Sequence, residues 1–164
     1  MSRCLFFALS CLIAAGASHA EPAQSVLRKD VPATVEAELA TRESLCRLAE
    51  RGDLVIPDGA LTRSELNDHR GDEFILAVCR LSCAKDPPGP SRACDQSLIF
   101  LSAEKGYEPI VMPGEVLDIR RAPGKPMKLL SSAQDEKTAC PVEDGVCNIL
   151  YELQGGELIA SGIE

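Results

Sequence analysis

The sequence has no tryptophan, and aromatic residues make up only 4% of its 164 positions. Its core must therefore be aliphatic, because the large rings that usually dominate buried area are scarce. A glycosidase is also disfavoured. Although 25 Asp and Glu residues could supply the carboxylate pair of such an enzyme, few rings are available to hold a sugar.

Motifs of other enzyme classes are missing as well. The chain has no G-x-S-x-G elbow, and a serine triad would have to use His69, the only histidine after residue 20. Glycine-rich phosphate loops and dinucleotide fingerprints are absent. No C-x-x-C pair is present to suggest a redox thiol or a zinc site. We therefore expect a non-enzyme with no catalytic residue, no cofactor and no bound metal.

Basic residues are few and dispersed: 17 Lys and Arg stand against 25 Asp and Glu, for a net charge of −8. The longest basic clusters are the pairs Arg28-Lys29 and Arg120-Arg121. Nucleic acids and anionic lipid surfaces attract proteins with larger basic patches. We therefore expect no nucleic-acid partner, and the acidic balance suits a protein kept in solution by its charge.

The longest apolar stretch lies at the start of the chain, from Leu5 to Ala15, and is shorter than the ~20 residues that span a bilayer. Arg3 precedes it, and Ser18 and Ala20 after it place small residues at the −3 and −1 positions of a cleavage site, so the stretch is typical of a signal peptide over residues 1–20. We expect cleavage near Ala20 and a periplasmic or secreted protein without membrane insertion. Lipid attachment at Cys11 is the alternative, which the alanine three residues before it disfavours.

Six cysteines remain after residue 20. An even number in an exported chain predicts a disulfide framework. Zinc sites favour paired close spacings together with histidines, whereas this chain has no C-x-x-C pair and only His69 as an imidazole ligand. The six are Cys46, Cys79, Cys83, Cys94, Cys140 and Cys147.

The pairing of these cysteines can be narrowed by geometry. The segment Phe74–Cys83 reads as one strand, on which Cys79 and Cys83 lie on the same face, ~13 Å apart. Bridged cysteines have Cα atoms within ~7 Å, so these two take different partners. The simplest pairing joins cysteines across short loops and leaves one long bridge: Cys83–Cys94, Cys140–Cys147 and Cys46–Cys79.

The mature chain reads as a flexible lead-in over residues 21–29 and one domain over residues 30–164. Apolar residues at helical spacing predict a helix from Asp30 to Arg51, with Gly52 after its end. Alternating patterns and turn residues then predict short strands. The expected fold is α+β and mostly β, with an N-terminal helix packed on a disulfide-stapled antiparallel β-meander. The predicted strands are 54–56, 74–83, 97–103, 110–112, 116–121, 127–131, 147–153 and 157–160, with Gln154-Gly155-Gly156 joining the last two.

The most distinctive segment runs from Glu65 to Glu73. It resembles the D-x-N-x-D-G-x-x-D-[YF] loop of FG-GAP-type calcium repeats, in which alternate oxygen side chains surround a cation. That resemblance implies ligands at Glu65 and Asn67 in the first two positions and at Asp72 or Glu73 in the last. Here His69-Arg70 replaces the Asp-Gly of the family. We therefore expect a polar turn that binds calcium weakly or not at all.

The wider arrangement resembles small secreted proteins of Gram-negative bacteria that have no assigned activity. The shared features are a helix with one cysteine, the acidic loop, a cysteine-bearing strand, the segment SLIFLSAEKGY and a late cysteine pair. This resemblance implies no catalytic residue. We expect a non-catalytic binding or structural module whose partner is a protein or an envelope component. The alternative is an inhibitor or immunity protein against a secreted hydrolase such as a lysozyme-type enzyme.

Overall fold

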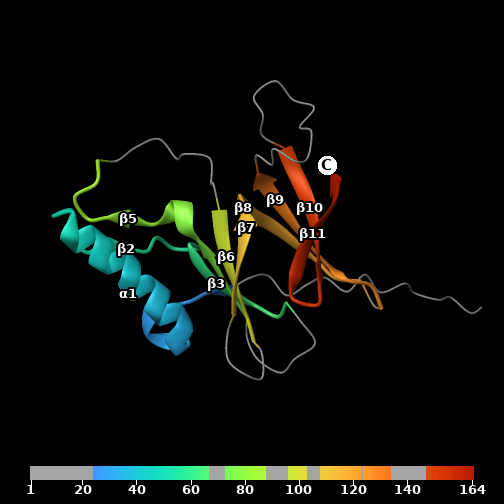
Figure 1. The fold of residues 1–164 in the computed structure, drawn as a ribbon, viewed down its shortest axis with the longest axis horizontal. Helices are drawn as coiled ribbons and strands as arrows, with labels where there is room; N and C mark the ends of the chain where they lie inside the picture. The colour runs from blue at the N-terminus through green and yellow to red at the C-terminus, as the bar shows by residue number, and fades with distance from the viewer. Residues whose placement is uncertain (1–23, 67–72, 88–95, 103–107, 123, 134–146) are drawn as a thin grey trace, which may run out of the picture.

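The computed structural model describes residues 24–66, 73–87, 96–102, 108–122, 124–133 and 147–164 (Figure 1). The predicted signal peptide, its cleavage site near Ala20 and Cys11 lie outside these residues. The described chain forms a mostly-β α+β fold in which every strand pair is antiparallel. The predicted fold class is confirmed.

Helix α1 spans Ala33–Leu48 and is three residues shorter at each end than predicted. It begins after Pro32, whose carbonyl accepts the N–H of Glu36 at 3.0 Å, since proline can start a helix but cannot continue one. Residues before it, predicted as a flexible lead-in, include strand β1 (Gln24–Ser25) and a 3-10 turn at Arg28–Asp30. The lead-in is therefore ordered from residue 24 onward.

The central sheet has five strands in the order β1-β3-β4-β6-β7. Its inner strands carry long apolar runs because both faces of the sheet are covered. All five residues of β4 and five of the six in β6 are buried. The remaining bounds are β3 Leu61–Ser64, β4 Glu73–Ala77, β6 Gln96–Leu101 and β7 Glu108–Pro113.

A second sheet is a four-stranded meander in the order β11-β10-β9-β8. Strands β10 and β11 meet in a two-residue turn, Gly155-Gly156, in which both φ angles are positive, as this turn type requires. The predicted three-residue loop is thus one residue too long, because Gln154 pairs with Glu157. The bounds are β8 Glu115–Arg120, β9 Met127–Ala133, β10 Cys147–Gln154 and β11 Glu157–Ile163.

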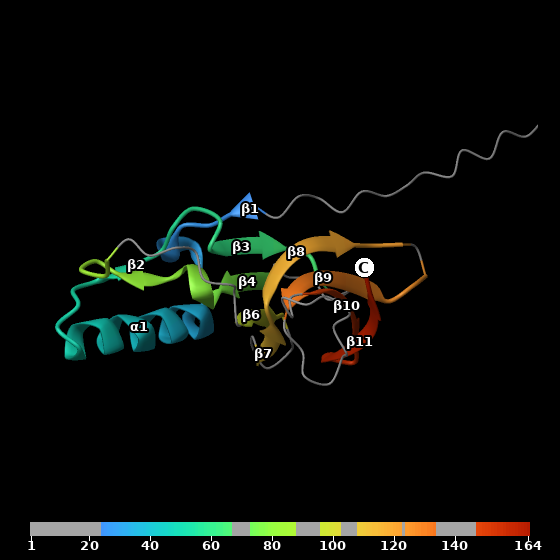
Figure 2. The ribbon, with the colours of Figure 1, turned by 90° about the horizontal axis from the view of Figure 1, so that it is seen from above.

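The molecule has three layers, with α1 on one face of the central sheet and the second sheet on the other (Figure 2). Alternation along each central strand divides its side chains between two cores. One core packs Val35 and Leu39 of α1 against the central sheet. The other lies between the sheets and includes Ile99, Ile149 and Tyr151.

The chain passes from the central sheet to the second sheet at Gly114, which has φ +77°. A Cβ atom there would lie 2.0 Å from the carbonyl oxygen of Ser132, so only glycine fits. Two buried hydroxyls hold this corner: Ser97 donates to the carbonyl of Gly114 at 2.8 Å, and Ser131 donates to that of Pro113 at 2.6 Å. The corner thus fixes the angle between the sheets.

The predicted strand Phe74–Cys83 is not continuous. Strand β4 ends at Ala77, a 3-10 turn follows at Val78–Arg80, and β5 (Ser82–Cys83) pairs instead with β2 (Leu54–Val55). The turn redirects the chain away from the central sheet. Cys79 and Cys83 therefore do not share one strand face.

This turn also changes the disulfide pairing. Cys46 on α1 bonds Cys83, with their Cα atoms 5.6 Å apart, so the predicted bridges Cys46–Cys79 and Cys83–Cys94 are wrong. The continuous strand had separated Cys79 from Cys83, and the short loop after Cys83 had favoured Cys94 as its partner. Cys79 and Cys147 are also disulfide-bonded, and their partners lie outside the described residues. The predicted Cys140–Cys147 bridge therefore stays a prediction.

Candidate functional site: the base of the acidic loop

The segment from Glu65 to Glu73, which resembles a calcium-binding loop, lies between β3 and β4. Its flanking residues, Glu65, Leu66 and Glu73, are described, whereas Asn67 and Asp72 lie outside the described residues. Leu66 is buried in the core between the two sheets, and Glu73 is the first residue of β4. Arg121, just after β8, reaches the same place from the second sheet.

Glu73 is fully buried, with none of its surface exposed. Its Oε2 accepts the backbone N–H of Leu66 at 2.6 Å, a bond that closes the loop at its base. Its Oε1 has no hydrogen-bond partner in the described structure. Burial raises the pKa of Glu73, and the backbone N–H donors and the positive charge of Arg121 only partly oppose this shift.

Arg121 faces both described carboxylates of the loop. Its Nη1 lies 3.4 Å from Oε2 of the exposed Glu65. Burial raises the pKa of Glu73 and the positive charge of Arg121 opposes that rise, so this carboxyl lies within the field of the guanidinium. The Nη2 of Arg121 is buried without a hydrogen-bond partner among the described residues. A guanidinium therefore provides the positive charge next to these two acids.

The geometry does not fit a calcium site. Calcium needs six to eight oxygen ligands, and carboxylates supply most of its charge balance. Here one predicted ligand, Glu73, is buried and bonded to the backbone, and the other, Glu65, pairs with an arginine. No group of three or more His, Cys, Asp or Glu side chains within the described residues could hold a metal ion. The arrangement can instead tie the loop to both sheets.

The sequence identified Glu65 and Glu73 but missed their partners. Arg121 was visible only as half of a basic pair, and it lies 56 positions from Glu65. No local pattern links residues so far apart in the chain. Leu66 gave no signal either, because its role at the site belongs to its backbone N–H.

None of the helices in the described part of the chain is long and apolar enough to cross a membrane. No known protein family, curated protein sequence or solved structure matches this chain.

Proposed function

We propose that this chain is a non-catalytic binding module that works in the periplasm or outside the cell. The observation that carries the proposal is the loop base, where protein groups already engage both described carboxylates. Glu73 is bonded to the backbone of Leu66, and Glu65 is paired with Arg121. A general acid, a general base or a metal ligand would need to face substrate or cation instead.

The disulfides support the proposed compartment. Cys46 and Cys83 are bonded to each other, and Cys79 and Cys147 are bonded as well. Disulfides form and persist in oxidising compartments and are rare in the reducing cytoplasm. Together with the predicted signal peptide over residues 1–20, this bonding supports export.

The loop base also supports a role in recognition. Leu66 and Glu73, on either side of residues 67–72, are both almost completely buried. A loop whose two ends are fixed in a rigid scaffold loses less entropy when it binds a partner. Binding residues are disproportionately found on loops held in this way.

Surface charge indicates the kind of partner. Many of the described basic side chains are in ion pairs, so the excess of acidic residues dominates the remaining charge. An acidic protein associates fastest with a basic partner. This favours a basic protein or envelope component and, as a second candidate, a lysozyme-type hydrolase that the chain would inhibit. The paired basic residues are Arg28, Arg42, Arg47, Arg51, Arg80, Arg120, Arg121 and Lys128.

The test is affinity capture from envelope extract with the oxidised mature chain, followed by calorimetry with each purified protein that is retained. We expect one stoichiometric partner whose affinity falls on Glu65→Lys, which reverses a charge at the loop. The control is the same chain reduced and alkylated, which should retain nothing specific. If the partner is a hydrolase that an equimolar amount of the chain inhibits, the second candidate is correct.

A screen of hydrolase substrates tests whether the chain is an enzyme instead. Turnover by the purified chain that disappears on Glu65→Gln or Glu73→Gln would contradict the proposal. Both substitutions keep side-chain size and remove only the ionisable group. Loss of turnover would therefore report chemistry at the loop rather than misfolding.

A further inference from the structure

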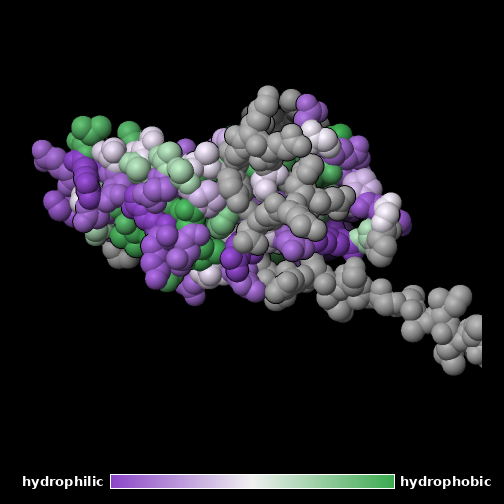
Figure 3. All heavy atoms as spheres, turned by 90° about the horizontal axis from the view of Figure 1, so that it is seen from below, coloured by the Kyte–Doolittle hydropathy of each residue, from purple (hydrophilic) through white to green (hydrophobic). Residues whose placement is uncertain are grey.

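Most exposed positions of α1 recur at helical spacing and form what we call the outer stripe, which carries no charged residue: Ala33, Thr34, Ala37, Thr41, Ser44, Leu45 and Leu48. Arg47, the other exposed residue of the helix, lies beside this stripe. Two large aliphatic side chains are strongly exposed there, Leu45 at 61% and Leu48 at 81%. In Figure 3, pale and green atoms run along the upper left margin, over α1, beside purple charged residues.

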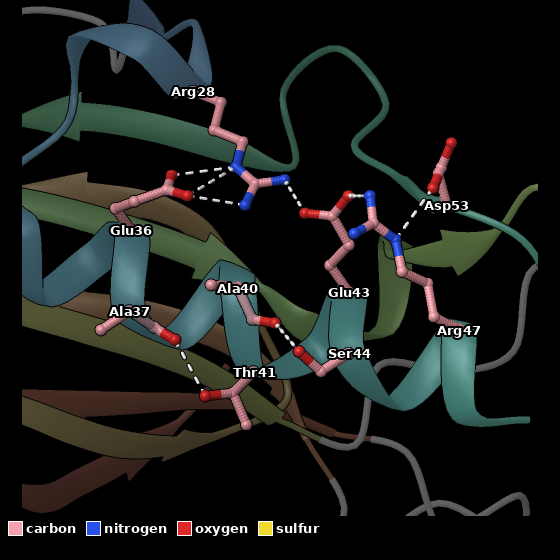
Figure 4. Close-up of polar contacts among 9 residues, drawn as sticks. All are labelled: Arg28, Glu36, Ala37, Ala40, Thr41, Glu43, Ser44, Arg47 and Asp53. Carbon is pink, nitrogen blue, oxygen red and sulfur yellow. Dashed lines mark hydrogen bonds and ion pairs between the residues drawn. The ribbon is translucent and has the colours of Figure 1, made fainter.

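Two of the three hydroxyl groups on this stripe, those of Thr41 and Ser44, bond within the helix. Thr41 donates to the carbonyl of Ala37, and Ser44 donates to that of Ala40, both at 2.9 Å (Figure 4). Hydroxyls that bond back to the helix backbone can be covered by another surface without losing hydrogen bonds to water. Most of the stripe is therefore chemically apolar although three of its seven residues are Ser or Thr.

The charges beside the stripe form closed ion pairs. On one flank Arg28 binds Glu36 at 2.6 Å and Glu43 at 2.7 Å, and Arg47 binds Glu43 at 2.6 Å (Figure 4). On the other flank Arg42 binds Glu38 at 2.6 Å. Both flanks carry charges of both signs, so a second surface can approach without strong repulsion even though the chain is acidic.

Side-chain size changes along the stripe. The first half carries small residues, Ala33, Thr34 and Ala37, and the second half carries Leu45 and Leu48, with Thr41 between the halves. We propose that the outer stripe is a self-association surface, on which α1 of a second copy packs antiparallel about a two-fold axis at Thr41. Leu45 then lies opposite Ala37 of the second copy, and Leu48 lies opposite its Thr34. Large side chains fill the space above small ones, and the match is reciprocal.

Charge complementarity supports the same arrangement. In this arrangement the two-fold axis is perpendicular to both helices. Each flank of one helix therefore lies next to the same flank of the other helix. Arg47 is six residues after Thr41 and Glu36 is five residues before it, so they face each other across the interface. On the other flank, Arg42 is one residue after Thr41 and Glu38 is three residues before it, so these two also lie near each other across the interface. Antiparallel packing also aligns the two helix dipoles favourably.

The size of the stripe predicts the strength of the contact. From Thr34 to Leu48 it is ~21 Å long at ~1.5 Å per residue. A single helical face buries less than the ~1,200 Å² typical of stable interfaces, so the dimer is weak and reversible. Sedimentation velocity of the oxidised mature chain should show the average mass rising toward that of a dimer as concentration increases from micromolar to millimolar.

Two matched variants test the location. Leu48→Glu places an acid over Thr34 of the second copy and should weaken association about tenfold or more, because Leu48 is the most exposed large apolar side chain of the stripe. Ile159→Glu makes the same kind of change on β11, at a residue 47% exposed on the second sheet, and should leave association unchanged. Both positions are exposed, and a thermal melt of each variant confirms folding.

Cross-linking tests the direction of packing. Position 41 of one copy lies opposite position 41 of the second copy, so Thr41→Cys should form a covalent dimer under mild oxidation. Positions 48 of the two copies are ~21 Å apart, beyond the ~7 Å at which cysteines bridge, so Leu48→Cys should stay monomeric.

Three results would overturn the proposal: a monomer at every concentration, a dimer that Leu48→Glu does not weaken, or cross-linking of Leu48→Cys as fast as that of Thr41→Cys. A stripe that binds only a different protein gives the first result. Because none of these results concerns the acidic loop, self-association and the proposed binding function can fail separately.

Discussion

The two layers that cover the central sheet are attached to it in different ways. Helix α1 contributes two fully buried aliphatic side chains, Val35 and Leu39, and its far end is fastened by the Cys46–Cys83 disulfide. The second sheet contributes a larger apolar face, and the continuous chain joins it to the central sheet at Gly114. Its outer strands are linked as well, because Arg120 on β8 pairs with Glu164 beyond β11.

The difference shows where a covalent bond is needed. Burying Val35 and Leu39 stabilises the helix layer by roughly 3–6 kcal/mol, at ~1.5–3 kcal/mol for each side chain. A disulfide that closes a loop of this length contributes ~4 kcal/mol in the chain-entropy model, a similar amount. The helix layer therefore depends on its disulfide, whereas the sheet layer depends on packing and on its corner.

The largest expected effect is on the sheet layer, from Gly114→Ala. The added Cβ meets the backbone of Ser132 at 2.0 Å and is also strained by the positive φ. Backbone strain of ~1–3 kcal/mol and overpacking of ~1–3 kcal/mol add to a large share of a typical stability of ~5–15 kcal/mol. Chemical denaturation measures the loss.

Gly155→Ala is the matched control for the corner. Its φ is also positive, at 59°, but nothing lies within 4 Å of the added Cβ. It should therefore show the strain alone. Equal losses for the two variants would mean that the corner at Gly114 is not tightly packed.

The next largest effect is on the helix layer, from the double variant Cys46→Ala/Cys83→Ala. Removing a bridge with a sequence separation of 37 residues should cost ~4 kcal/mol. If Cys147 pairs with Cys140 as predicted, that bridge closes a short loop, and its removal should cost about 1.4 kcal/mol less. Thermal melts compare the two, and equal melting temperatures would show that loop length does not determine their importance.

Much of the fold could be predicted because its signals are local. The helix stripe and the alternating strands follow from periods of 3.6 and 2, and glycine and proline mark their ends. Strand β3 was missed because Leu-Thr-Arg-Ser holds one buried apolar residue, Leu61, and resembles a loop. The bend after Ala77 was missed because Val78 and Leu81 continue an apolar pattern that a strand and a 3-10 turn share.

The site was less predictable because its contacts are not local. Glu65 and Glu73 were found through a loop pattern, but the same residues serve a cation site or an internal ion pair. Which role they take depends on Arg121, which only the folding of β8 against β4 brings near. The disulfide pairing failed for a similar reason, since one misplaced bend at Val78–Arg80 changed the position of Cys83.

A smaller effect concerns the joint between the two sheets, where Glu73 is buried. Because the folded pKa of Glu73 is raised above the ordinary value of 4.5, the folded state binds its proton more tightly than the unfolded state does. This group therefore makes the protein more stable as the pH falls from its folded pKa to about 4.5. Glu73→Gln should remove that rise and slightly stabilise the protein at neutral pH.

The pH profile of the free energy of unfolding tests this prediction, with Glu65→Gln as the control. Glu65 is exposed, so its substitution should change stability by less than ~1 kcal/mol. Carboxylates held at low pKa, such as Glu164 beside Arg120, lose their contribution only below the ordinary glutamate range. If Glu73→Gln keeps the rise in stability as the pH falls toward about 4.5, the carboxyl of Glu73 is not desolvated in solution.

The smallest expected effect is that of calcium, which should be none. If Arg121 supplies the positive charge at the loop base, the joint between the sheets needs no ion. A ligand at a hundred times its Kd stabilises a protein by ~2.7 kcal/mol, so real binding would clearly raise the melting temperature. We expect no shift of the melting temperature with millimolar calcium or with a chelator, whereas a reductant should loosen the helix layer through Cys46–Cys83.

Calorimetry showing tight, stoichiometric calcium binding that Asn67→Ala abolishes would contradict this. In that case the acids at the loop base, rather than the guanidinium of Arg121, would determine the charge of the site.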